Sequence, residues 1–494
     1  MGRVTSPERA PPPAAVSNPS LSPRSHFFWS NLARHIAALM AVAVGAAAFA
    51  ILFRATINLV FTRLYRAHDV LTAFQSLPWY DRLILPALGG GFAGLMGLFA
   101  SRLKGGGGVG EVMEAVVLGK VRISLRLTSL KAFGSWLAIV TGGSVGREGS
   151  IIQFGGGLGG ALGRVFRLRE GQVRGLIAAG SAAGFAAAYN TPLAAVLFVV
   201  EVVTGVIALD VVLPAIIATP IATAIMRLVI GGGPIYGKRS FAIGSDVELL
   251  IPAFVGLLAG LAGPAFMALL ARGEGFFGQL QLPKPARAAL GGLAVGALAI
   301  GLPQVTGNGY EAINLILDGR MAIGLVLILL VGKAVATTAS VSSGSPGGVF
   351  TPSLFIGAAL GGAVGHAAAR IAASSTLDAV QGYALIGMAA MTAATTHAPI
   401  MATVMVFELS GDYAIALPLL IATSVATILS RWLRTDSIYG DELRRHGRAW
   451  DITIDGRQMR RLTPVDSSGR ELGPDAAVDG ASPNPKQHQQ AEHG

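Results

Sequence analysis

The chain has no cysteine and few charged residues for its length. Asp, Glu, Lys and Arg make up only 13% of its 494 residues, whereas soluble domains usually carry about 25%. The missing cysteines exclude disulfide bonds, thiolate metal sites and cysteine nucleophiles. With 52% hydrophobic residues and so little charge, the chain cannot bury its apolar surface in an ordinary globular core.

The chain contains several long apolar runs. Those at 36–53, 249–271, 321–339 and 413–429 approach the roughly 20 residues needed to cross about 30 Å of hydrocarbon. Others are shorter and are broken by Gly or Pro, so hydropathy alone would miscount the helices. The pattern predicts an all-α polytopic membrane protein that contacts the lipid bilayer.

The net charge of +11 is concentrated at the two ends. The flanking basic residues are Arg3, Arg9, Arg24 and Arg34 before the first span, and Arg431, Arg434, Arg444, Arg445, Arg448, Arg457, Arg460 and Arg461 after the last. The positive-inside rule therefore predicts that both termini are cytoplasmic, which requires an even number of crossings. Basic residues that flank spans do not indicate a nucleic-acid partner.

Composition divides the chain into a membrane domain and two tails. Residues 1–32 are rich in Pro and Ser, and residues 446–494 are polar and contain several prolines, so both segments are predicted to be disordered cytoplasmic tails. Residues 33–445 form the expected transmembrane domain, with repeat halves at about 33–235 and 245–440.

An internal repeat links the two halves. The segment from Glu148, EGSIIQFGGGLGGALG, aligns without gaps with FTPSLFIGAALGGAVG from Phe350. Further on, the segment from Gly180 aligns with that from Gly387, which matches Glu201 with Glu408. Repeats with Gly- or Pro-interrupted apolar segments are typical of secondary transporters, whose broken helices meet at the substrate site.

Three glycine-rich turns each lead into a small-residue helix: KGGGGVG from Lys104, GGSVGREGS from Gly142 and SSGSPGGVF from Ser342. Such a turn presents free backbone N–H groups and the positive end of a helix dipole, which together favour an anion. Many of the other glycines are expected only to pack helices closely. The G-x-G-x-x-G pattern from Gly105 is rejected as a dinucleotide site because no strand precedes it.

The three turns resemble the signature motifs of the CLC chloride channel and transporter family. Gly106 to Glu111 is similar to G-S-G-x-P-E, Gly146 to Ser150 to G-R-E-G-P, and Gly347 to Pro352 to G-x-F-x-P; SIYGDEL, with Tyr439, resembles a late tyrosine segment. The resemblance covers about residues 33 to 445. It implies a CLC-type bundle of two inverted repeats, and a homodimer with one anion pathway in each subunit.

The resemblance also assigns roles to residues. The backbone N–H groups of Val349 and Phe350 and the hydroxyl of Tyr439 would coordinate a central chloride or similar anion, with the turn at Gly107 and Gly108 nearby. The amides of Arg147, Glu148 and Gly149 would line an outer site. Glu148 would be the gate, since a tethered carboxylate competes with an anion and is released when protonated. We interpret the Arg147 side chain as a structural charge partner. No cofactor, metal or enzymatic activity is implied.

Two positions depart from the family pattern. Gly107 stands where the family has a serine whose hydroxyl contacts the anion, and Gly110 stands where it has a proline, so nitrate or another small anion stays open beside chloride. Exchangers usually carry a second glutamate at the position of Val202. That valine favours a channel, while the neighbouring Glu201 is predicted to accept hydrogen bonds from a helix end, as is Glu408.

Several alternatives stay open. A proton-coupled chloride antiporter of the same family is the nearest, and a fluoride exporter is more remote. An intramembrane serine hydrolase could use Ser342 to Ser345 with His366 or His397. Little chain follows Tyr439, so the cytoplasmic regulatory domains of many relatives are not expected, and we expect a bacterial inner membrane as the location.

Overall fold

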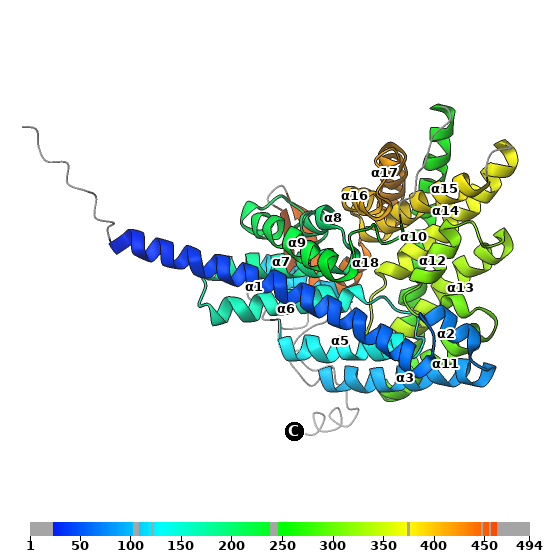
Figure 1. Cartoon of the computed structure of the whole chain (residues 1–494), viewed down its shortest axis with the longest axis horizontal. Helices are drawn as coiled ribbons and strands as arrows, with labels where there is room; N and C mark the ends of the chain where they lie inside the picture. The colour runs from blue at the N-terminus through cyan, green and yellow to red at the C-terminus, as the bar shows by residue number, and fades with distance from the viewer. Residues whose placement is uncertain are drawn as a thin grey trace, which may run out of the picture.

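The computed structural model describes residues 23–101, 108–119, 123–237, 246–372, 376–445, 448–453 and 456–461. Figure 1 shows a bundle of helices, many of them short, that run in different directions. The elements up to residue 230 are α1 Pro23–Val60, the π-helical turn η1 Phe61–Tyr65, α2 Val70–Ser76, α3 Trp79–Ser101, α4 Gly108–Leu118, α5 Leu125–Val140, α6 Glu148–Val165, α7 Glu170–Tyr189, α8 Pro192–Leu197, the π-helical turn η2 Phe198–Thr204 and α9 Leu209–Ile230. Those that follow are η3 Asp246–Leu249, α10 Leu250–Gln279, α11 Lys284–Gly301, η4 Pro303–Val305, α12 Tyr310–Leu317, α13 Ile323–Ser342, α14 Phe350–Ala372, α15 Thr376–Thr396, α16 Pro399–Ser410, α17 Ala416–Leu433, α18 Ile438–Arg445, β1 Arg448–Thr453 and β2 Gly456–Arg461.

The bundle has the surface of a membrane protein. Seven helical stretches among the described residues are long and apolar enough to cross a membrane. Large apolar side chains such as Leu52, Leu228 and Ile428 are exposed on the outside, at 61%, 86% and 72%. Such faces suit hydrocarbon rather than water, so the predicted polytopic membrane fold is confirmed.

The two halves repeat the same break in a helix. Helix α7 ends just before Asn190 and α15 just before His397, and both of these residues have left-handed backbones, with φ of 57° and 58°. A proline then starts the next helix in each half, Pro192 in α8 and Pro399 in α16. Proline favours the first helical position because it needs no hydrogen-bonded N–H there. The broken helices and the repeat predicted from the sequence are therefore present.

Glycine pairs bring the helices of each half into close contact. A methyl group added to Gly155 of α6 would collide with the backbone of Gly180 in α7. The equivalent pair in the second half, Gly357 of α14 and Gly387 of α15, is equally close. These glycines serve helix packing, as expected for small residues in membrane bundles.

Each half also caps a helix of the other half. The Glu201 carboxylate accepts hydrogen bonds from the N–H groups of Ile400 (3.2 Å) and Met401 (2.6 Å) at the start of α16. Glu408 does the same for Leu193 (3.0 Å) and Ala194 (2.9 Å) at the start of α8. A carboxylate is stabilised at a helix N-terminus by free N–H groups and by the helix dipole. The prediction that this pair of glutamates has a shared structural duty is confirmed.

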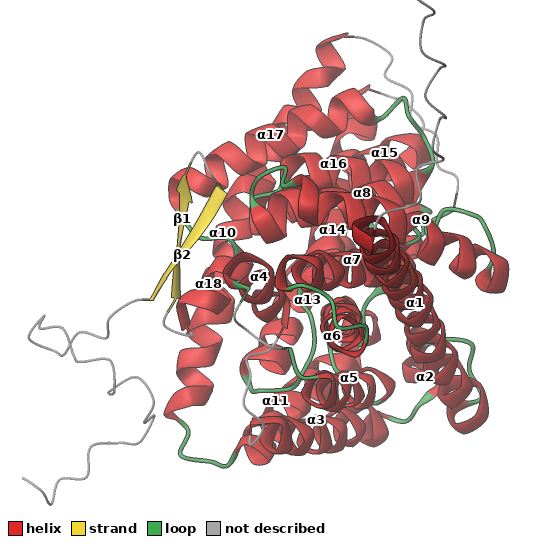
Figure 2. Cartoon of the chain, turned by 90° about the vertical axis from the view of Figure 1, so that its left-hand side faces the viewer, coloured by secondary structure: helices red, strands yellow, loops and turns green. Residues whose placement is uncertain are grey.

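The structure differs from the predicted disordered tails where each tail adjoins the membrane domain. Helix α1 begins at Pro23, inside the expected tail of residues 1–32. The helix of the first apolar run therefore starts earlier in the chain than that run does. Strands β1 and β2 form an antiparallel pair from Arg448↔Arg461 to Thr453↔Gly456, inside the expected tail of residues 446–494. Figure 2 shows this pair at the edge of the helical bundle near α18. Each strand has only six residues, which is too few for the alternation of apolar and polar side chains to predict a hairpin. The rest of both tails lies outside the described residues.

The reciprocal caps predict that the loss of either glutamate has a similar effect on stability. We expect Glu201→Ala and Glu408→Ala to lower the free energy of unfolding by similar amounts, about 2 kcal/mol each, because each leaves two helix-start N–H groups unsatisfied. The Gln variants, which keep one acceptor oxygen, should lose less. Thermal unfolding of the purified variants in detergent measures this. Unchanged transitions in both Ala variants would show that the caps do not stabilise the fold.

Candidate functional site

Two of the glycine-rich turns pair with each other at the centre of the molecule. The Gly146 N–H donates to the Gly348 carbonyl at 2.7 Å, and the Gly348 N–H donates to the Gly146 carbonyl at 2.8 Å. These residues are equivalent in the repeat, so the bridge joins the starts of α6 and α14. Ser144 fixes the first turn further, since its N–H donates to Ser340 Oγ of α13 at 3.0 Å.

Glu148 is the first residue of α6 and its side chain is completely buried. The Tyr189 side chain at the end of α7 and the Thr351 side chain in the first turn of α14 face its carboxylate. Their hydroxyls also contact each other at 2.9 Å. The carboxylate folds back over Gly146, where an added methyl group would collide with it. Glu148 therefore lies where both halves meet.

Cavities open on both sides of this point. We name the cavity of about 520 Å³ beside α18 the inner cavity; its lining includes Gly149, Val349, Phe350 and Tyr439. We name the cavity of about 490 Å³ near α12 the outer cavity; its lining includes Arg147. The two chain neighbours of Glu148 thus line different cavities, and Glu148 lies between them.

Several of the predicted anion-binding residues line the inner cavity, whereas Arg147 lines the outer one. Val349 and Phe350 lie at the start of α14, where first-turn N–H groups have no partner within the helix. Tyr439 of α18 lines the same cavity and is 6% exposed. Gly108, the first residue of α4, and Gly149 of α6 also line it. Gly107 lies outside the described residues.

The Arg147 side chain does not form a close ion pair with its neighbour. Its Nε lies 3.9 Å from Glu148 Oε1, longer than a hydrogen bond. Its guanidinium lies over the Tyr310 ring, 4.9 Å from the centroid, a cation–π geometry. Arg54 lines the same outer cavity, which therefore carries two arginines.

At the position where exchangers have a second acid, Val202 lies in η2 and is 1% exposed. The neighbouring Glu201 is engaged at the start of α16 by the hydrogen bonds described above. Neither side chain lines the inner or the outer cavity as the structure describes them.

The residues proposed for serine hydrolysis serve other contacts. The hydroxyls of Ser342 and Ser343 donate to the main-chain carbonyls of Leu270 (3.0 Å) and Ser340 (2.9 Å). His366 contacts the Met321 carbonyl at 3.1 Å. His397 contacts Ser430 Oγ of α17 at 3.3 Å. This is not the arrangement of a nucleophile and its base.

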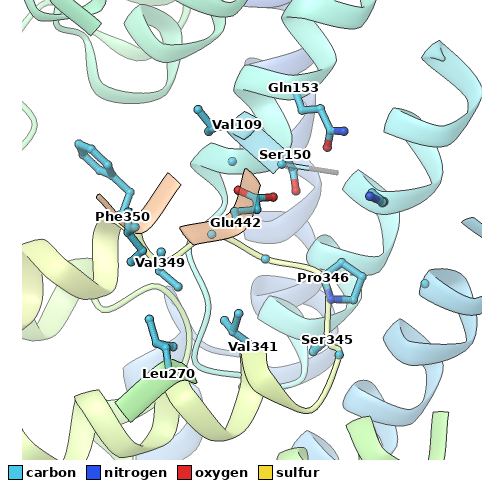
Figure 3. A pocket seen from close by; sticks show the side chains of 18 of the residues that line it. Val109, Ser150, Gln153, Leu270, Val341, Ser345, Pro346, Val349, Phe350 and Glu442 are labelled. Atoms are coloured by element: carbon cyan, nitrogen blue, oxygen red, sulfur yellow. The ribbon is translucent and has the colours of Figure 1, made fainter. Parts of the chain in front are cut away.

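Sequence reasoning missed several charged residues near the inner cavity. Lys131 of α5 and Glu442 of α18 line it, and Figure 3 shows Glu442 there. Glu111 of α4 accepts a 2.5 Å hydrogen bond from Gln153 Nε2 of α6. Glu442 is one helical turn beyond Tyr439, so its i, i+3 spacing on a short helix was a signal that could have placed it on the same face.

The match to known proteins agrees with this geometry. The family model for the voltage gated chloride channel matches residues 89–431. The chain belongs to the CLC family. A ClcB-like chloride channel protein from Ralstonia nicotianae is 38% identical over 379 residues, 75% of this chain and 87% of the relative. The voltage-gated ClC-type chloride channel ClcB of Salmonella typhimurium is 35% identical over 383 residues, 76% of this chain and 91% of the relative.

A solved CLC structure shares the fold. The crystal structure of a slow cyanobacterial Cl⁻/H⁺ antiporter superposes with a TM-score of 0.75 at 25% identity, over 83% of this chain and 97% of that one. The family contains chloride channels and antiporters, which are not enzymes. The predicted CLC-type bundle is therefore confirmed.

The paired turns leave little room for a side chain at their centre. A Cβ at Gly348 would lie 3.2 Å from the Gly149 nitrogen and 3.4 Å from the Gly146 carbonyl oxygen. We expect Gly348→Val to lower the free energy of unfolding by about 1 to 3 kcal/mol, the usual cost of overpacking. Gly278→Val in α10 is the matched control, since nothing lies within 4 Å of a Cβ there. Equal thermal transitions for the two variants would contradict the close pairing.

Proposed function

We propose that the chain moves chloride or a similar small anion across the membrane, and that Glu148 is the gate. The observation that carries this proposal is the position of Glu148 between two cavities, with Arg147 lining one and Gly149 the other. A buried carboxylate at a helix start occupies the place that suits an anion. When it is protonated and moves aside, the pathway opens.

The inner end of the pathway supplies the anion site. The backbone N–H groups of Val349 and Phe350 and the Tyr439 hydroxyl coordinate the anion there. The Gly149 amide belongs to the same end of the pathway, and the Arg147 amide to its outer part. Support comes from the convergence of Gly149, Val349, Phe350 and Tyr439 on one cavity and from its cationic lining residues Lys131, Lys284 and Arg287. Such charges raise the local anion concentration.

Transport as a channel is the mode we favour. Val202 is apolar and buried, and Glu201 is committed to capping α16, so neither offers the second proton site of an exchanger. The names of the two curated relatives, both described as chloride channels, point the same way.

Proton-coupled antiport is the second candidate. The structure of the cyanobacterial Cl⁻/H⁺ antiporter favours it, because that protein shares the fold over most of both chains.

In our proposal, the oligomeric state, the membrane and the orientation of the chain follow the family pattern. Two subunits form a homodimer with one pathway each, in a bacterial inner membrane. Both termini face the cytoplasm, which places the inner cavity on the cytoplasmic side. The membrane domain comprises residues 33–445, divided into halves of about 33–235 and 245–440.

The gate is tested with Glu148→Gln in liposomes loaded with chloride. We expect chloride efflux to rise by about tenfold or more at neutral pH, since removing a like charge near 4 Å is worth about 1 to 4 kcal/mol. The pH dependence of the efflux should also weaken, because the titrating group at the gate has been removed. Glu170→Gln, at the exposed start of α7, is the matched control. Unchanged efflux and pH dependence in Glu148→Gln would remove Glu148 from the gate.

The transport mode is tested by recording external pH while a chloride gradient drives flux in the wild-type chain. We expect chloride movement without uphill proton movement. Uphill proton movement that disappears in Glu148→Gln would instead establish the antiporter. If every liposome retains its chloride, the same assay would be repeated with nitrate, because Gly107 and Gly110 depart from the family pattern.

A further inference from the structure

The inner cavity contains an acid that the family resemblance does not assign. Glu442 lies on α18, three residues after Tyr439, and lines the cavity together with Val349 and Phe350. Figure 3 shows its carboxylate among the lining side chains. A carboxylate is an unexpected neighbour for an anion site, because two negative charges at short range repel each other.

The Glu442 carboxylate occupies space that two glycines leave open. A methyl group added to Gly110 would lie 3.4 Å from Glu442 Cδ and 3.5 Å from Oε2. One added to Gly108, whose φ is +73°, would collide with Oε1. Gly110 stands where the family has proline and Gly107 where it has the anion-binding serine. The acid therefore packs against Gly108 and Gly110, which follow in the chain the position where the family has its serine.

Charged and titratable groups line the inner cavity together with Glu442 or lie beside it. They are Glu111 of α4, Lys131 of α5, Glu274 of α10, Lys284 and Arg287 of α11, and Tyr439 on α18 itself. Lys131 is held electrostatically by both Glu111 and Glu442. An ionised Glu442 thus competes with an entering anion for Lys131.

Protonation changes the Glu442 carboxyl from a competitor into a donor. The neutral group carries one O–H that donates a hydrogen bond, as a serine hydroxyl does. It also releases Lys131 to interact with the anion.

We propose that an anion binds in the inner cavity together with one proton, which is taken up by Glu442. The proton is transferred from a hydronium ion in the water on the α18 side: one hydronium O–H bond breaks, the carboxyl O–H forms, and a water molecule is left. The neutral carboxyl then donates to the anion in place of the missing serine hydroxyl. This inference rests on the proposed anion transport and adds to it the group that couples anion affinity to pH.

The expected signature is linkage between chloride binding and protons. Chloride affinity should fall by up to about tenfold per pH unit above the titration of Glu442, the limit for one coupled proton. In Glu442→Gln, which keeps an N–H donor and carries no charge, chloride affinity should not depend on pH.

The test is titration calorimetry of the purified full chain with chloride, in two buffers of different ionisation enthalpy. All variants carry Glu148→Gln, so that the gate contributes no proton. We expect proton uptake per bound chloride in this parent, none after adding Glu442→Gln, and uptake restored by Glu442→Asp. Asp441→Asn is the matched control, because Asp441 pairs with Arg434 and does not line the inner cavity.

The outcomes separate the two proposals. Proton uptake that persists in Glu442→Gln, or that is absent from the parent although chloride binds, overturns the role of Glu442 and leaves anion transport standing. The loss of uptake in Asp441→Asn would overturn it as well. If chloride binds to none of the variants nor to the wild type, the proposed chloride site fails and the role of Glu442 fails with it.

Discussion

The pair of hydrogen bonds between Gly146 and Gly348 is the contact on which the rest of the site depends. It joins equivalent residues of two repeats, so α6 and α14 begin at the same place and direct their free N–H groups toward one region. Backbone polar groups that lie away from water need partners, and here the two turns satisfy each other. A Cβ at either glycine would crowd the opposite turn, so this contact favours glycine.

A second constraint comes from the acids inside the apolar bundle. An ionised carboxylate surrounded by hydrocarbon is costly unless it finds partners. Glu201 and Glu408 find them at helix starts in the opposite half, and Glu111 finds one in Gln153. Glu148 differs, since its one ion pair among the described residues is the 3.9 Å contact with Arg147. That difference separates the structural acids from the acid we propose as the gate.

Much of this arrangement could be predicted from the sequence. The repeat, the turns at Gly146 and Gly348, and the duty of Glu201 follow from patterns that each half repeats. Glu442 could not be found in this way, because its contact with Gly108 and Gly110 joins segments far apart in the chain and has no counterpart in the other half. The β1–β2 hairpin was also missed, since a pair of six-residue strands leaves little periodic signal.

The reciprocal caps have a consequence for biosynthesis. The start of α8 is completed by Glu408, which lies 215 residues beyond Leu193 in the chain. At a synthesis rate of about 5 to 20 residues per second, the ribosome needs about 10 to 40 s to reach that residue. During this interval the first half lies in the membrane with an uncapped helix start. Neither repeat can therefore complete its helix caps alone. The first repeat is translated first, so it is the one that stays uncapped until the second has been made.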